Sequence, residues 1–153
     1  MSPTNILREA GKRPGARARG TRRPRAAGKR EILIRAGTVS IRARLVDTPT
    51  ADRIWQALPI YTTAETWGSS IHFETPVETG REPKPKWSVA PGEIAFWVEE
   101  DRVLIAFGPT PISKPGEIRL PCPCNIWAAA LDDVAALASV RPGERVAVLE
   151  ADS

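Results

Sequence analysis

The sequence has one histidine, one tyrosine, one methionine and two cysteines in 153 residues. With His72 as its only histidine, the chain cannot form a catalytic histidine pair or a metal site with several histidines. Cys122 and Cys124 are separated by Pro123 alone, so a disulfide between them would be strained. The cysteine content is also too low for a secreted disulfide scaffold. We therefore expect no metal, no cofactor and, with no disulfide framework, a cytoplasmic location.

No run of about 18 apolar residues occurs, so we expect no membrane span. The twin arginine Arg22-Arg23 is not followed by the apolar stretch that an export signal needs, which argues against export. The sequence also lacks a glycine-rich phosphate loop and the G-x-S-x-G pattern of a nucleophile elbow, although Ser69 and Ser70 follow Trp67-Gly68.

Charge divides the chain into two parts. Residues 1–30 contain ten basic residues and one acidic residue, a net charge of +9, with hardly any large apolar side chains. Such a segment cannot bury enough surface to offset its ordering entropy, so we predict a disordered tail. It could be a nucleic-acid-binding arm, a solvated tail or the product of a start codon assigned too early. Residues 31–153 contain 12 basic and 17 acidic residues, a net charge of −5, so we expect nucleic acid to bind only through the tail.

The remainder, residues 31–153, is predicted to be one mainly β domain. Alternation predicts a hairpin over 31–45 and a strand over 66–75. A second hairpin is predicted over 93–98 and 102–107, and its second strand, apolar on both faces, is predicted to be central and covered. Broken strand pieces are predicted at 118–120 and 125–127, and a last strand over 145–149. A helix is predicted to begin at the Thr48 cap with Pro49 in its first position and to end before Pro59. A second short helix is predicted around 131–138, and 78–92 is predicted to be a long loop, a feature that is often functional.

Three segments carry a resemblance to a known family. They are Thr66-Trp67-Gly68 with Ile71-His72-Phe73-Glu74-Thr75-Pro76-Val77, then Gly92-Glu93-Ile94-Ala95-Phe96-Trp97, then Ala106-Phe107-Gly108-Pro109-Thr110-Pro111-Ile112-Ser113. In this order they resemble a small prokaryotic cyclophilin-like family of unassigned function, over roughly 32–150. The resemblance implies a closed antiparallel β-barrel of about eight strands with two capping helices.

The resemblance also raises the question of prolyl isomerase activity. Isomerases of this fold carry an arginine in a Phe-His-Arg-like stretch, followed by a glutamine-containing run. Here the corresponding stretch is Ile71-His72-Phe73-Glu74, and the only glutamine is Gln56, on the predicted helix. The fold is therefore implied without the usual catalytic residues.

Several residues are candidates for a site. His72 and Glu74 share one face of a predicted strand, where they could act as a proton donor and its partner, or be a solvated surface pair. Cys122 and Cys124 could bind a soft metal, but small apolar residues at a strand edge are the alternative. Large rings could line a ligand-binding groove or simply pack in the core; they are Trp67, Phe73, Trp87, Trp97 and Phe107.

We therefore predict a binding domain for a peptide or a small molecule. A divergent peptidyl-prolyl isomerase, or another enzyme that uses His72 and Glu74, is the alternative.

Overall fold

The computed structural model describes residues 30–151, so the predicted disordered tail lies outside the described residues except for Arg30. The elements, in chain order, are β1 (Glu31–Ala36), β2 (Val39–Leu45), α1 (Pro49–Ala57), β3 (Ile60–Thr66), β4 (Ser70–Glu74), β5 (Lys86–Ser88), β6 (Glu93–Trp97), η1 (Val98–Glu100), β7 (Arg102–Ala106), β8 (Arg119–Ala130), η2 (Val134–Ser139) and β9 (Arg145–Glu150). Nothing in this part of the chain forms a helix long and apolar enough to cross a membrane.

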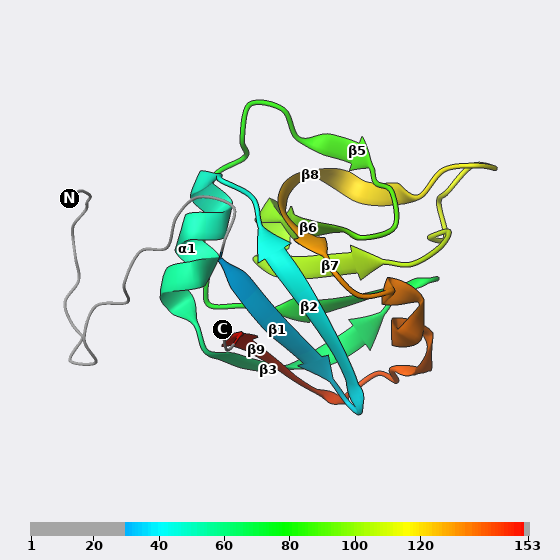
Figure 1. Ribbon diagram of the computed structural model, residues 1–153. Helices are drawn as coiled ribbons and strands as arrows, with labels where there is room; N and C mark the ends of the chain where they lie inside the picture. The colour runs from blue at the N-terminus through cyan, green and yellow to red at the C-terminus, as the bar shows by residue number, and fades with distance from the viewer. Residues whose placement is uncertain (1–29, 152–153) are drawn as a thin grey trace.

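The strands form a closed antiparallel barrel (Figure 1). Their order is β2-β1-β9-β3-β4-β7-β6-β8-β5, and β2 also pairs with β8. This extra pairing closes eight strands, from β2 to β8 in the order just given, into a ring. Strand β5 is the last in that order and pairs with β8 outside the ring. The predicted fold class, a closed cyclophilin-like barrel of about eight strands, is confirmed.

The barrel interior is filled by the residues that alternation assigned to it. Ile32 and Ile34 of β1, together with Ile71 and Phe73 of β4, are fully buried in the main core, where Trp127 of β8 is the largest side chain. Alternate residues point outward, because successive side chains of a strand lie on opposite faces.

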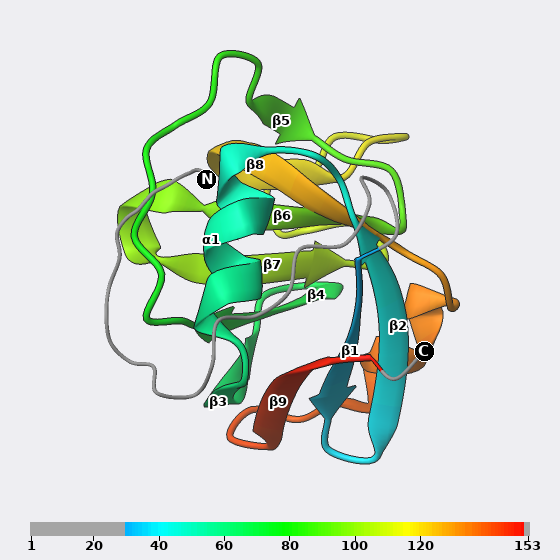
Figure 2. The ribbon, with the colours of Figure 1, turned by 60° about the vertical axis from the view of Figure 1, so that its left-hand side comes forward.

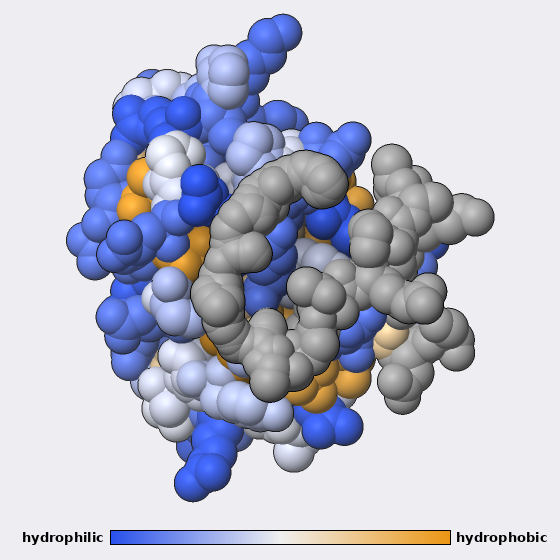
Figure 3. Space-filling view, turned by 90° about the vertical axis from the view of Figure 1, so that its left-hand side faces the viewer, coloured by the Kyte–Doolittle hydropathy of each residue, from blue (hydrophilic) through white to orange (hydrophobic). Residues whose placement is uncertain are grey.

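Helix α1 begins and ends as predicted. The Thr48 hydroxyl accepts a hydrogen bond from the Ala51 amide, Pro49 occupies the first position, and the helix stops before Pro59. Its buried side chains Ile54 and Trp55 pack on the core. Figure 1 shows α1 on one side of the ring and η2 on the other. In Figure 3, the coloured part of the surface on the α1 side is largely hydrophilic, with a few hydrophobic patches.

Several predicted elements differ from the structure. The strand predicted over 66–75 is the second half of a hairpin, since β3 precedes it and Gly68, with φ of 59°, makes the turn. The helix predicted around 131–138 is the 3₁₀ helix η2, in which Val134 and Leu137, three residues apart, are the buried pair while Leu131 is exposed. The loop predicted over 78–92 contains the short strand β5.

The strand pieces predicted at 118–120 and 125–127 are one strand, β8. Its prolines, Pro121 and Pro123, are tolerated because the pairing with β5 is irregular there. While β5 advances from Lys86 to Ser88, the partner on β8 jumps from Cys124 to Arg119, so both prolines lie in the stretch that is out of register.

Candidate functional site

His72 points to the outside of the barrel because its neighbours on β4 point inward. Ile71 and Phe73 are buried in the main core, whereas His72 is half-buried and Glu74 is exposed. In the sheet, His72 lies opposite Glu65 of β3 on one side and Leu104 of β7 on the other. The predicted placement of His72 and Glu74 on one outward face is therefore correct.

An arginine and a tryptophan from the two next strands contact His72. Arg102 of β7 lies opposite Glu74 and places Nη1 3.4 Å from Nδ1 of His72. Trp97 of β6 lies opposite Arg102, and its ring meets the imidazole edge-on, with centroids 6.1 Å apart and planes at 73°. We call the surface formed by His72, Trp97 and Arg102, with Glu74 beside it, the histidine face.

The contact with Arg102 favours one tautomer of the imidazole. A guanidinium can only donate, so Nδ1 of His72 must accept and the ring proton of the neutral form resides on Nε2. Burial, and then the charge of Arg102, lower the pKa of His72, against smaller opposing effects of Glu65 and Glu100. At neutral pH the histidine face therefore presents an uncharged Nε2–H donor beside a cation.

A second hydrophobic cluster supports the histidine face from one side. It lies outside the ring, between β6, β7 and β8 and the segments that cover them, and its buried members are Val89, Ala95, Leu104, Ala106, Ile118, Leu120 and Cys124. Trp67 and Trp97 are partly buried against this cluster. Trp97 thus packs on the cluster and also contacts His72, so the cluster holds one wall of the histidine face in place.

Cys122 belongs to a hydrogen-bonded chain near Trp97. Its thiol donates to Oε1 of Glu99 at 3.2 Å, and Glu99 also forms an ion pair with Arg81. Burial, and then the Glu99 carboxylate, raise the pKa of Cys122 to about 11. The thiol of Cys124 donates to the Cys122 carbonyl at 3.2 Å, and burial raises its pKa further.

Both thiols are therefore protonated at neutral pH, the form that is neither a nucleophile nor a metal ligand. Within residues 30–151, no group of three or more histidine, cysteine or acidic residues is arranged to hold a metal ion.

The aromatic candidates do not gather in one place. Trp67 and Trp97 both pack against the second cluster, and Trp97 is also part of the histidine face. Trp87 is 57% exposed on β5. Phe73 is fully buried inside the barrel and Phe107 packs against that same core, so neither lies on the surface with His72. Phe73 supports β4 from within, because it occupies the inward position next to His72.

Arg102 is the residue of this surface that sequence analysis did not place. It is 30 residues from His72, and only the pairing of β4 with β7 brings the two together. The residues after Arg102 in β7 are apolar on both faces, which predicted a covered strand but gave no direction for Arg102 itself. The register needed to connect Arg102 with His72 was not available from the alternation.

Two comparisons with known proteins agree with this architecture. The family model described as "Cyclophilin-like" matches residues 30–149. The solution structure of a hypothetical protein from Archaeoglobus fulgidus is similar, with a TM-score of 0.72 and 31% sequence identity, over 82% of this chain and 97% of that one. None of the curated proteins matches the chain.

Proposed function

The chain belongs to the cyclophilin-like family, and on that premise we propose that its histidine face binds a peptide or a small molecule. The observation that carries the proposal is the contact of His72, Arg102 and Trp97, which come from three adjacent strands. All three side chains are only partly buried, so each keeps surface for a ligand.

The chemistry of these groups favours a ligand with carbonyl oxygens next to an apolar ring. Arg102 and the Nε2–H of His72 are both hydrogen-bond donors, and they suit carbonyl oxygens. Trp97 and Trp67 offer flat apolar surface against which a ring can pack. A short peptide that contains proline combines both features.

A second candidate function is prolyl isomerisation. The observation that favours it is Arg102, a cation that takes part in the face although no arginine stands in the Ile71–Glu74 stretch of β4. A strong donor close to the prolyl nitrogen would draw its lone pair away from the amide and lower the barrier to rotation.

The test is NMR spectroscopy of the full chain with short Xaa-Pro peptides. The five tryptophans give five indole N–H signals, and two of them, from the buried Trp55 and Trp127, are internal controls. We expect the signals of Trp67, Trp97 and His72 to shift on titration, while those of Trp55 and Trp127 stay in place. Shifts confined to other residues, or none, would overturn the proposal.

The same samples separate binding from catalysis. Exchange between cis and trans peptide signals takes tens of seconds or more without a catalyst. Acceleration that Arg102→Gln abolishes and Arg53→Gln preserves would establish the isomerase. Arg53 is a matched control, because it is an exposed arginine on α1. Indole shifts without acceleration would establish a binding domain.

A further inference from the structure

The outward face of β2, β1, β9 and β3 is rich in arginine. The exposed side chains alternate with the buried ones, and the register aligns them in rows across the four strands. We call this surface the arginine face, after its exposed members Arg35, Arg42, Arg44 and Arg145, with exposed Tyr61 on β3 and one exposed carboxylate, Glu65, at the far end of β3. Half-buried Leu33, Ala147 and Leu149 lie between them.

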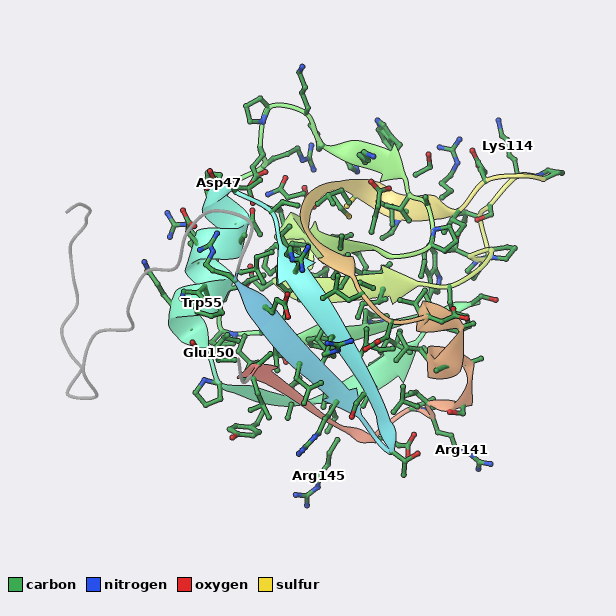
Figure 4. The ribbon with its side chains drawn as sticks, viewed as in Figure 1. Asp47, Trp55, Lys114, Arg141, Arg145 and Glu150 are labelled. Carbon is green, nitrogen blue, oxygen red and sulfur yellow. The ribbon has the colours of Figure 1, made fainter. Side chains whose placement is uncertain are left out.

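The face has a local positive charge although the domain as a whole is acidic. Arg44 forms an ion pair with Glu31 at 2.9 Å, and Arg42 forms a longer one with Asp132 at 3.5 Å. Arg35 and Arg145 have no ion pair with any residue in 30–151. Figure 4 shows Arg145 pointing away from the barrel. Two guanidinium groups are therefore available to an anionic partner.

Tyr61 is the most exposed large hydrophobic residue of the described chain, at 72%. It lies opposite Ala147 of β9, and Ala147 lies opposite Arg35 of β1. Arg145 is two residues before Ala147 and pairs with Thr63. Since neighbouring strands are about 4.8 Å apart, both free arginines are within roughly 10 Å of the tyrosine backbone. An open aromatic ring beside two cations can stack on a nucleobase while the cations hold phosphates.

We propose that the arginine face binds single-stranded nucleic acid, with Tyr61 stacking on a base and Arg35 and Arg145 contacting phosphates. The basic N-terminal segment is not expected to bind the arginine face itself, because residues 1–29 have a net charge of +8 and the face is also positive. That segment joins the described chain at Arg30, immediately before β1, and adds positive charge for the same polyanion. A double strand keeps its bases stacked inside the helix, and so would leave the exposed tyrosine unused.

The test is fluorescence anisotropy of a labelled single-stranded oligothymidylate with the full chain, over a series of salt concentrations. Tyr61→Ala is expected to weaken binding roughly tenfold, as is typical when a stacking residue is removed. Arg35→Ser with Arg145→Ser is expected to reduce the slope of log affinity against log salt by about 1.4, since each phosphate contact on a single strand contributes about 0.7. A duplex of equal length is expected to bind with no dependence on Tyr61.

Matched controls distinguish the face from the basic segment, which every variant retains. Trp87→Ala removes another exposed ring and Arg53→Ser another arginine without an ion pair in the described chain, both outside the arginine face. They are expected to bind like the wild type. The proposal is overturned if Tyr61→Ala binds as tightly as Trp87→Ala, if the double arginine variant keeps the slope of Arg53→Ser, or if the wild type does not bind the oligonucleotide.

Discussion

The two outward sides of this barrel differ in how far their side chains are covered. On the arginine face the strands alternate between core and solvent, and the outward residues remain open. On the other side, Val89 after β5 and the residues Ile118 and Leu120 pack with side chains of β6 and β7 and bury a second cluster there. In Figures 1 and 2, β5 lies against β8, at the opposite end of the molecule from β9.

The cover over this side explains why β7 has apolar residues on both of its faces. Val103 and Ile105 face the main core, whereas Leu104 and Ala106 face the second cluster. A strand covered on both faces has no need of alternation. The histidine face lies at the margin of this covered region, where Trp97 is fixed by packing but still reaches the surface. On the arginine face, Arg42 and Arg44 have ion pairs, and the side chains of the other members stand open to solvent.

Truncating one residue on each side tests most directly whether the covered side contributes more to stability than the open side. Leu104→Ala is expected to lower the free energy of unfolding by about 2–3 kcal/mol, since Leu104 is 1% exposed and its removal leaves a cavity. Tyr61→Ala on the arginine face is expected to change it by no more than about 0.5 kcal/mol. Urea denaturation monitored by tryptophan fluorescence measures both. If the two variants are equally stable, the outer cluster is not a second core.

A smaller effect is expected from the anchor of the segment that leads to β5. Asn125 of β8 is 1% exposed and forms three hydrogen bonds of 2.9 Å, accepting from the Glu82 amide and donating to the Gly80 carbonyl and the Thr50 hydroxyl. Asn125→Ala is expected to cost about 1–3 kcal/mol, because buried polar groups lose their partners. Hydrogen exchange at Glu82 is expected to accelerate as the segment loosens.

The control for this anchor is Gln56→Ala, which removes an exposed amide from α1 and is expected to leave both readings unchanged. Unaltered exchange at Glu82 in Asn125→Ala would mean that the segment is held by other contacts, and that the cover over the second cluster does not depend on this anchor.

Sequence patterns predicted one half of this molecule better than the other. The hairpin over 31–45 and helix α1 follow from period-two and period-3.6 patterns, and both are found where they were predicted. The covered side was harder to predict, because β8 continues through Pro121 and Pro123, and β5 has only three residues. The resemblance to the cyclophilin-like family supplied the closure of the ring, which local periodicity does not contain.

The candidate site also has one part that the sequence pattern predicted and one part that it did not. Outward placement of His72 and Glu74 follows from alternation on a single strand, whereas the contact of Arg102 with His72 depends on strand register, a property of two segments at once. The burial of Phe73 next to His72 was implied by the same alternation. Its inclusion among groove residues came from its size and aromatic character, and these describe core residues equally well.

The smallest effect expected here is also the most specific to the histidine face. Because His72 is the only histidine, its ring protons can be titrated by NMR without ambiguity. Its pKa is expected to lie below the usual 6.5, through burial first and Arg102 second. Arg102→Gln is expected to raise this pKa, and Arg53→Gln on α1 is expected to leave it unchanged.

The lowered pKa also makes the stability of the fold depend on pH. A protonated His72 is disfavoured in the folded state, so the unfolded chain binds the proton more readily. The stability contributed by the neutral ring is therefore complete above pH 6.5 and falls as the pH decreases from there toward the folded-state pKa. If Arg102→Gln and Arg53→Gln titrate alike, Arg102 does not act on His72 in solution, and the histidine face loses the contact on which its proposed function depends.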